Sequence, residues 1–567
     1  MRYAMTDSVF ISTDKVPARK GAEILLEILA SEGVEYIFGN PGTTELPLMD
    51  ALVGKTDISY ILALQEASAV AMADGYAQAA RKPGFLNLHT AGGLGHGMGN
   101  LLNAKISHTP LVVTAGQQDL RHAITDPLLF GDLVQLAQPA VKWAQEVSHP
   151  SQLPVLLRRA FHDVVAPPPG PVMLSLPMNV MEEMSDTPLL SRSVIDTHSV
   201  ASSLESLAEE LARLQPGRLA IIAGDELYSS QAAPQAVKLA EMLGAPVYGS
   251  SWPSRIPFPT SHPLWAGNLP TKAAAIADEL SNYDAIFALG GKSLISILYT
   301  SSSAVPDNCA VYQLSSDVGD LGRTYPTRLS LVGHLRASLD ALLPILAGLT
   351  QPTRADRNAN SDALRVQRDA NRKTLYAQAE DDYTSGVISP LVAAREVMRV
   401  IGHDIAIVDE AIVTSSAVRQ FLNSPSYEQY SFLRGGALGW GMPAAVGCSL
   451  GLGRAPVVSL VGDGAALYSP QSLWTAAHEN LPVTFIVMNN RQYNVLKNFM
   501  RSQQHYLAAQ TERFIAMDLV NPEIDYQALA RSMGVTARRI TRAADIAPAV
   551  EAGIHSGQAN LIEIVLA

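Results

Sequence analysis

The 567 residues of this chain are too many for one hydrophobic core, so we expect about three domains. Hydrophobic residues make up 47% and charged residues 17%, a composition typical of a well-buried globular protein rather than a disordered one. The formal net charge of −12, with acids and bases interspersed, argues against binding to nucleic acid or to an anionic membrane.

Cysteine usage and hydropathy favour a cytoplasmic protein. Cys309 and Cys448 lie far apart without ligand-like spacing, so we expect two reduced core thiols. No N-terminal stretch has the pattern of a signal peptide, and no apolar run is long enough to span a membrane. The sequence therefore predicts a soluble enzyme without a membrane partner.

The first part of the chain alternates short apolar runs with helical patterns. Residues 1–20 are polar and are predicted to be a tail, and residues 21–185 form the first domain. An amphipathic helix is expected over Gly21–Glu32. Strands are expected over Tyr36–Phe38, Ser59–Leu64, Gly84–His89, Leu111–Ala115 and Val172–Leu176. This alternation is typical of a parallel sheet with helices on both faces.

The same design recurs twice. A middle domain over 198–348 carries expected strands, and a polar stretch over 349–386 is predicted to be a linker with a solvated helix and a loop. A third domain occupies 387–567. The strands are Leu219–Ala223, Pro246–Tyr248, Ala285–Leu289 and Ala310–Leu314, then Ile405–Asp409, Val457–Val461, Pro482–Met488 and Asn560–Val565. The predicted fold is three consecutive open, doubly wound parallel-sheet α/β domains.

Oxygen ligands for a divalent cation follow two neighbouring strands of the third domain. One strand ends in Gly462-Asp463-Gly464, and after 24 residues the next ends in Asn489-Asn490. Ligands bind at the carboxyl ends of strands in such sheets, and one acid with one amide suits Mg²⁺, which also takes water and phosphate oxygens. A helix expected to begin near Ser469 would point its N-terminus at the same place, which favours phosphate.

This pair of motifs resembles the signature of thiamine-diphosphate-dependent enzymes. The resemblance implies a pyruvate-decarboxylase-like architecture, with the first domain binding the pyrimidine of the cofactor and the third binding its diphosphate. It implies that Mg²⁺ is held by Asp463, the Asn490 side chain and the Gln492 carbonyl. The cofactor would contact Gly462, Gly464 and Ala465. In Arg434–Pro443, a carbonyl near Gly436 would accept from the amino group of the cofactor, and Leu438 would separate its two rings.

The family also requires a glutamate on the pyrimidine ring, which promotes the tautomer that activates the cofactor. Glu66 follows a strand and precedes a helix, so it matches this position. Taken alone it could equally be an acid that favours a helix N-terminus.

Further motifs resemble the benzoylformate decarboxylase branch of the family. They are Phe38–Pro47, Leu64–Ala67, Ala73–Gln78, Arg81–Pro83, Asn87–His89, Thr114–Gln118, Pro257–Pro263 and Leu473–Ala477. The resemblance implies that His89 and His262 transfer protons during catalysis, a role that suits an imidazole. Thr43 replaces a serine of that branch and keeps its hydroxyl, so the resemblance implies a catalytic residue of the substrate pocket that binds the substrate carboxylate. Changes at Ile412, Val495 and near Phe499 fall in the implied substrate pocket, whereas His96, His108 and His122 are interpreted as structural hydrogen-bonding residues.

Three functions remain open. The first is non-oxidative decarboxylation of an aromatic or other bulky 2-oxo acid to an aldehyde. The second is a carboligase or aldehyde lyase, or an acetolactate-synthase-like enzyme. The third is a cofactor-binding protein without turnover. The resemblance also implies at least a homodimer, because the two halves of each site come from different subunits, and a homotetramer, a dimer of dimers, as the expected assembly. The glycine cluster Gly92–Gly99 does not fit a nicotinamide fingerprint, since Met98 occupies the third glycine position.

Overall fold

The computed structural model describes residues 17–54 and 57–567. The chain divides into two compact units, which are considered separately: residues up to Ala77 with Lys82–Asp196, and Gln78–Arg81 with Thr197–Ala567. Most of the predicted tail, residues 1–16, lies outside the described residues.

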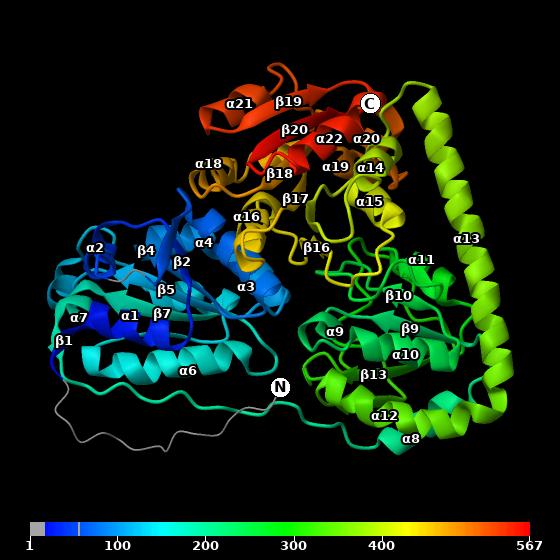
Figure 1. Cartoon of the computed structure of the whole chain (residues 1–567), viewed down its shortest axis with the longest axis horizontal. Coiled ribbons are helices and arrows are strands. Elements are labelled where there is room, and N and C mark those ends of the chain that lie inside the picture. Colours follow the sequence, from blue (N-terminus) through cyan, green and yellow to red (C-terminus); the bar gives the residue numbers. More distant parts are fainter. Residues whose placement is uncertain (1–16, 55–56) are drawn as a thin grey trace. The chain divides into compact units, whose positions relative to one another are not determined.

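The first unit contains a six-stranded parallel sheet in the order β3-β2-β4-β5-β7-β6. The helices α1 and α6 cover one face of the sheet, and α3 and α4 cover the other (Figure 1). The strands are β2 (Tyr36–Gly39), β3 (Ser59–Leu62), β4 (Gly84–His89), β5 (Leu111–Gln117), β6 (Ala144–Glu146) and β7 (Val172–Pro177). The helices are α1 (Gly21–Ser31), α2 (Leu46–Leu52), α3 (Glu66–Ala80), α4 (Thr90–Ile106), α5 (Leu133–Ala137), α6 (Leu153–Val165) and α7 (Met178–Glu182), with the short η1 (Thr43–Glu45) and η3 (Gln138–Ala140).

The end of the predicted tail is ordered, which corrects the expectation for residues 17–20. Strand β1 (Arg19–Lys20) pairs antiparallel with β8 (Met184–Ser185), and the Arg19 guanidinium donates to the Thr187 carbonyl. Strands pair through main-chain N–H and C=O groups, which every residue except proline has, so the polar side chains of this segment did not reveal the pairing.

The second unit contains two further six-stranded parallel sheets, in the orders β11-β10-β9-β12-β13-β14 and β16-β15-β17-β18-β20-β19. The first has β9 (Leu219–Ala223), β10 (Val247–Gly249), β11 (Trp265–Asn268), β12 (Ala285–Leu289), β13 (Ala310–Ser315) and β14 (Leu329–Val332). The second has β15 (Ala406–Glu410), β16 (Tyr430–Phe432), β17 (Val457–Gly462), β18 (Val483–Asn489), β19 (Thr536–Ile540) and β20 (Asn560–Val565). The fold class predicted from the sequence is confirmed.

Helices alternate with these strands. In the middle domain they are α8 (Leu204–Arg213), α9 (Glu226–Ser229), α10 (Ala233–Leu243), α11 (Ala273–Leu280) and α12 (Leu335–Thr350). In the third domain they are α14 (Pro390–Met398), α15 (Ser415–Phe421), α16 (Gly441–Gly451), α17 (Asp463–Ala466), α18 (Gln471–His478), α19 (Asn494–Arg501), α20 (Leu507–Thr511), α21 (Tyr526–Ser532) and α22 (Ile546–Ile554).

The first and third sheets have the same connectivity. Counting strands along the chain within each sheet, both follow the order 2-1-3-4-6-5, whereas the middle sheet follows 3-2-1-4-5-6. In open parallel sheets the strand order reverses at one point, and ligands bind beside the carboxyl ends of the two strands there. The reversal lies between β2 and β4 in the first sheet and between β15 and β17 in the third.

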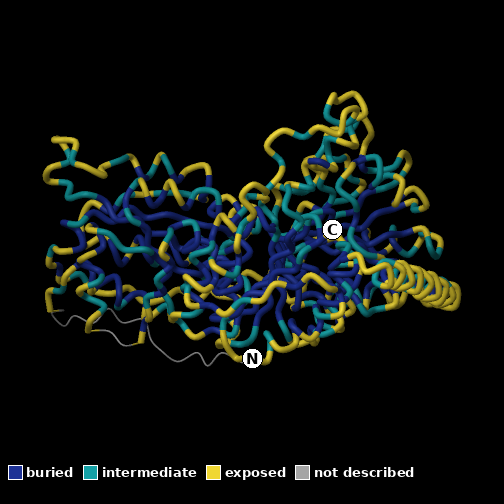
Figure 2. The backbone as a smooth tube through the Cα atoms, turned by 90° about the horizontal axis from the view of Figure 1, so that it is seen from above, coloured by how far each residue is buried: buried dark blue, intermediate teal, exposed yellow. Residues whose placement is uncertain are grey.

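The predicted linker is mostly one long helix, α13 (Arg354–Thr384). Its residues are largely exposed, in contrast to the buried strands (Figure 2). Arg357 and Ala379 are the buried exceptions. The Arg357 guanidinium donates to the main-chain carbonyls of Leu243, Ala212 and Leu214. This side chain attaches the beginning of α13 to the middle domain.

In the described part of the chain, no helix combines the length and apolarity required to cross a membrane. Cys309 and Cys448 are both free, and Cys448 is buried in the core as predicted, whereas Cys309 is only partly buried.

Candidate active site

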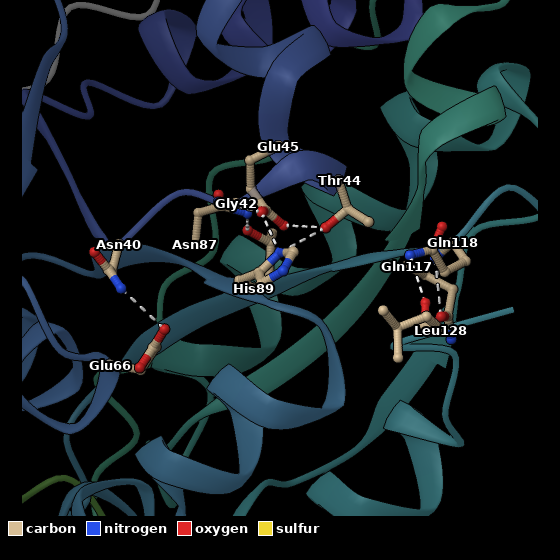
Figure 3. Close-up of polar contacts among 11 residues, drawn as sticks. Asn40, Gly42, Thr44, Glu45, Glu66, Asn87, His89, Gln117, Gln118 and Leu128 are labelled. Carbon is tan, nitrogen blue, oxygen red and sulfur yellow. Dashed lines mark hydrogen bonds and ion pairs between the residues drawn. The ribbon is translucent and has the colours of Figure 1, made fainter.

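His89 is the last residue of β4, beside the point where the first sheet reverses its order. Its Nδ1 lies 2.8 Å from Glu45 Oε2 and 3.1 Å from Thr44 Oγ1, as Figure 3 shows. Thr44 in turn donates to Glu45 Oε1 at 2.7 Å. Since a carboxylate accepts hydrogen bonds, this arrangement places a proton on Nδ1 and leaves Nε2 of His89 to give or take a proton.

Two glycines provide the space for the paired side chains of His89 and Glu45. A Cβ atom on Gly42 would lie 2.4 Å from the His89 ring, and one on Gly116 would lie 1.9 Å from Glu45 Oε1. No real Cβ approaches other atoms so closely, so any other residue at either position would displace the pair.

Glu66 is the first residue of α3, and each of its carboxylate oxygens has a side-chain partner. The Asn40 amide donates to Oε1 at 3.1 Å (Figure 3), and His96 Nδ1 lies 3.1 Å from Oε2. Burial alone would raise the pKa of Glu66, but the hydrogen bonds from Asn40 and His96 outweigh it and hold the pKa below its usual value.

Sequence reasoning therefore missed three residues of the first half-site. The hydroxyl beside His89 belongs to Thr44, whereas Thr43 is exposed at the start of η1. Glu45 was not singled out, although it follows Gly42 by three residues and accepts from its N–H, the spacing of a helix cap. His96 was interpreted as a structural residue, but it contacts the predicted cofactor-activating acid. Gln117 and Gln118, which end the Thr114–Gln118 motif, hold the following loop by donating to the carbonyls of Gly131 and Leu128.

Asp463 begins the short helix α17 directly after β17, beside the reversal point of the third sheet. Its Oδ1 accepts from the Gly464 N–H at 2.7 Å, whereas the buried Oδ2 has no hydrogen-bond partner among the described residues. Burial raises the pKa of Asp463, although backbone N–H groups of Gly464 and of residues 490–492 oppose this effect. A buried carboxylate oxygen without a donor is costly unless a cation binds there.

The turn after β18 faces this carboxylate. Asn489 is structural, since its amide donates to buried Glu563 at 2.7 Å. The Asn490 side-chain oxygen accepts from the Gln492 N–H at 3.1 Å. The Gln492 carbonyl accepts from the Asn494 N–H at 2.9 Å and has a second lone pair for another partner. One carboxylate oxygen, one amide oxygen and one carbonyl form a donor set that fits a divalent cation with phosphate and water as further ligands.

The helix expected near Ser469 begins slightly later, as α18 at Gln471, while α17 begins at Asp463 itself. Gly464 is closely packed, because a Cβ atom there would lie 2.5 Å from the Tyr493 ring. Gly462 has open space around its Cα, and Ala465 is buried.

The loop before α16 contains Gly436, with φ +82°, and half-buried Leu438. It is held by buried Glu410, whose carboxylate accepts from the N–H groups of Gly439 at 2.6 Å and Gly441 at 2.7 Å. Burial raises the pKa of Glu410 to about 7 in spite of these donors.

Three of the four residues predicted for the substrate pocket come together, whereas Thr43 does not line the same cavity and its role stays a prediction. Ile412, Val495 and Phe499 line one cavity of about 950 Å³ in the second unit. The other walls carry aromatic side chains of the middle domain and polar side chains of α13, among them Tyr248, Trp252, Trp265, Arg368 and Arg372. This volume lies in the range of small-molecule pockets, which is about 300–1,000 Å³.

His262 lies beside this cavity in sequence, between the lining residues Thr260 and Pro263, but its ring contacts another element. Nε2 lies 3.3 Å from Glu241 Oε1 on α10, and Nδ1 accepts from the Leu264 N–H at 3.2 Å. In the described structure His262 is therefore a hydrogen-bonded residue of the middle domain, and its catalytic role stays a prediction.

Comparison with known proteins identifies the family. The chain matches the N-terminal domain of thiamine pyrophosphate enzymes over residues 19–135, their central domain over 204–342 and their C-terminal domain over 413–564. The chain belongs to the thiamine pyrophosphate enzyme family.

Particular relatives point to two activities. A benzoylformate decarboxylase of Pseudomonas aeruginosa is 32% identical, over 95% of this chain and 97% of the relative. A solved 4-hydroxybenzoylformate decarboxylase of Rhodococcus jostii RHA1 is 28% identical, with a TM-score of 0.85 over 97% of this chain and 99% of that chain. A putative acetolactate synthase large subunit of Mycobacterium tuberculosis is 27% identical, over 96% of this chain and 99% of the relative. The chain is thus a thiamine-diphosphate-dependent enzyme whose relatives act as decarboxylases or synthases.

Proposed function

We propose that this enzyme decarboxylates an aromatic or other bulky 2-oxo acid without oxidation and releases the aldehyde. The observation that carries the proposal is the pair of His89 and Glu45 at the reversal point of the first sheet. The similarity to benzoylformate decarboxylases along almost the whole chain supports it.

Thiamine diphosphate, when bound, supplies a nucleophilic carbon and stores the electrons of the broken carbon–carbon bond. The chain must then deliver a proton to the carbon that has lost carbon dioxide. His89 suits this task, because Glu45 and Thr44 keep the proton of the neutral ring on Nδ1 and Nε2 stays available for transfer. Glu45 also stabilises the imidazolium that forms when Nε2 takes up a proton.

The proposed metal is Mg²⁺, with Asp463 Oδ2, the Asn490 side chain and the Gln492 carbonyl as protein ligands. The unpartnered, buried Oδ2 supports this assignment. Glu66 is the proposed acid for the pyrimidine ring, held by Asn40 and His96.

The cavity supports a bulky and acidic substrate. Among the described residues, its charged lining consists of Arg368, Arg372 and Arg419 against one acid, Glu279. Ile412, Val495 and Phe499 provide apolar surface for an aromatic or branched side chain.

Carboligation is the second candidate, favoured by the similarity to an acetolactate synthase and by the contact of His262 with Glu241 rather than with the cavity. Such a reaction joins the same activated fragment to an aldehyde or a second 2-oxo acid and does not need the final protonation.

A panel of 2-oxo acids, from pyruvate to benzoylformate and larger aryl analogues, tests both candidates. Carbon dioxide and aldehyde are measured with and without an added acceptor aldehyde. Release of aldehyde in equal amount to carbon dioxide, fastest with aryl substrates, supports the proposal. Carbon dioxide accompanied by hydroxyketone or acetohydroxy acid, even without added acceptor, would overturn it in favour of carboligation.

A further inference from the structure

A second histidine of the first unit lies against Glu66. His96 is in the second turn of α4, three residues after Gly93 and one before Gly97. A Cβ atom on Gly93 would lie 3.0 Å from Glu66 Cγ, and one on Gly97 would lie 3.0 Å from Val70 Cγ2. The glycine face of α4 therefore lets the first turn of α3 approach closely and brings His96 to the Glu66 carboxylate.

The two partners of this carboxylate differ in one property. The Asn40 amide can only donate a hydrogen bond to Oε1, whereas the His96 ring at Oε2 can also hold and release a proton. The His96 side chain is 65% exposed in the single chain, so one ring nitrogen faces Glu66 while the rest of the ring is accessible.

The other titratable groups nearby are few and are already paired or buried. Burial raises the pKa of Tyr60, and Glu45 and Glu66 raise it further, so this hydroxyl stays neutral. Glu45 is paired with His89. Besides Glu66, α3 carries Asp74 and Tyr76, both buried. Of the other elements packed on α4, β5, α5 and η3 contain no titratable side chain, and β4 contains only His89.

We propose that His96 is a positioning residue for Glu66, which fixes its carboxylate and returns a proton to it. This inference rests on the proposed role of Glu66 as the acid that activates the cofactor. Whenever Glu66 gives up a proton it is left as a carboxylate. The protonated ring of His96 then transfers the proton on Nδ1 to Oε2, which leaves a neutral imidazole and a neutral carboxylic acid, and the imidazole recovers its proton from water.

This arrangement has a consequence for pH dependence. A histidine beside a carboxylate can share one proton with it, and an imidazole ordinarily holds a proton up to near neutral pH. A carboxylic acid without such a partner ordinarily loses its proton well below that range. The protonated pair should therefore persist to higher pH than Glu66 by itself could.

The experiment compares His96→Asn, His96→Ala and the control His122→Asn with the wild-type holoenzyme. The asparagine amide can replace Nδ1 as a hydrogen-bond donor but cannot carry the proton. The readout is the exchange of the cofactor C2 proton for deuterium in the absence of substrate, followed by proton NMR after acid quench between pH 5 and pH 9. Cofactor affinity is measured separately by calorimetry.

We expect His96→Asn to keep the affinity for the cofactor and the exchange rate at low pH, while the decline of exchange at high pH moves about one pH unit lower. His96→Ala should lose about tenfold in exchange rate at every pH, and His122→Asn should match the wild type.

A second measurement does not use the cofactor. The carboxyl carbon resonance of Glu66, assigned by its loss in Glu66→Gln, should titrate at higher pH in His96→Ala than in the wild-type apoprotein. An unchanged Glu66 titration, or a His96→Asn exchange profile that superimposes on the wild type, would overturn the role of His96. If Glu66→Gln exchanged as fast as the wild type, the role of Glu66 itself, and with it the proposed function, would fail instead.

Discussion

Single residues decide how closely charged groups approach in the first half-site. Gly42 and Gly116 have no chemistry of their own, yet the His89–Glu45 pair exists only because neither carries a side chain. Their importance follows from the distances, since glycine is required where another group comes within contact distance of its Cα.

Replacing Gly42 by alanine should therefore move the His89 ring without removing any functional group. We expect turnover to fall by about a hundredfold, the cost of misplacing a catalytic group by ~1 Å, with cofactor affinity unchanged. Steady-state kinetics with calorimetric titration of thiamine diphosphate checks this. Gly92→Ala is the matched control, because its Cβ atom would meet no atom within 4 Å. Equal turnover of the two variants would contradict the importance of the pair.

For Asp463 we predict opposite effects on cofactor binding and on stability, because its buried Oδ2 lacks a partner among the described residues. Asp463→Ala should weaken Mg²⁺-dependent binding of thiamine diphosphate by at least about a hundredfold. The apoprotein should melt at or above the wild-type temperature, since the variant removes an unpaired buried carboxylate. Calorimetry measures the affinity for the cofactor, and thermal melts measure the stability. The control is Asp404→Ala, which removes an exposed carboxylate just before β15. Unchanged cofactor affinity would remove Asp463 from the metal site.

At the scale of elements, the functional residues follow the carboxyl ends of strands. His89 ends β4, Glu66 follows β3, Glu410 ends β15 and Asp463 follows β17. Both half-sites lie where sheets of identical connectivity reverse their strand order. One fold therefore positions an acid and a histidine in one domain and a carboxylate for a cation in another.

Glu410, the last residue of β15, links the carboxyl end of this strand to the first turn of α16. Glu410→Ala leaves three buried N–H groups, those of residues 439–441, without their acceptor, which should cost about 3 kcal/mol or more at pH 5. Because the folded pKa is about 7, above the ordinary 4.5, the folded chain keeps a proton that the unfolded chain loses between these values. The stability contributed by Glu410 therefore falls as pH rises through this window, by about 3 kcal/mol, and is constant above it.

Thermal melts of wild type and Glu410→Ala at pH 5, 6.5 and 8 test whether the stability contributed by Glu410 falls as pH rises. The gap between the two melting temperatures should narrow as pH rises, whereas the gap for Asp404→Ala should stay constant. A gap that stays constant or widens as pH rises would contradict the raised pKa of Glu410.

At the scale of the whole molecule, both half-sites are bordered by exposed apolar side chains. Leu46, beside Glu45, is 58% exposed, and Tyr468, shortly after Asp463, is also 58% exposed. Surfaces of this kind are usually buried against another protein surface. With the family resemblance, this predicts a homodimer at least, and a homotetramer as the complete assembly.

Sedimentation measures the assembly, and complementation tests whether the two halves of a site come from different subunits. Glu66→Gln and Asp463→Ala should each be inactive. When the two are co-expressed with different tags, mixed dimers should regain one intact site, which gives about a quarter of wild-type activity for random pairing. An active monomer, or no recovery in purified mixed dimers, would contradict the prediction.

The sequence by itself determined the strands at the centre of each sheet. Every predicted strand is present, with ends that differ by at most two residues, because buried parallel strands appear as continuous apolar runs. In the three large sheets, the strands that were missed are β6, β11, β14, β16 and β19, and all of them lie at sheet edges. The two-stranded sheet of β1 and β8 was missed as well. An edge strand is short and has one neighbour, so its pattern carries less of the burial signal.

For the site, sequence motifs named Glu66, His89, Asp463 and Asn490, since these residues follow strands in recognisable surroundings. The tertiary structure decided what each of them touches. It placed Thr44 and Glu45 beside His89, placed His96 beside Glu66, and turned His262 toward Glu241. Contacts between side chains from different strands and helices form or fail when the atoms move by a few tenths of an ångström. The spacing of residues along the chain does not determine their positions so closely.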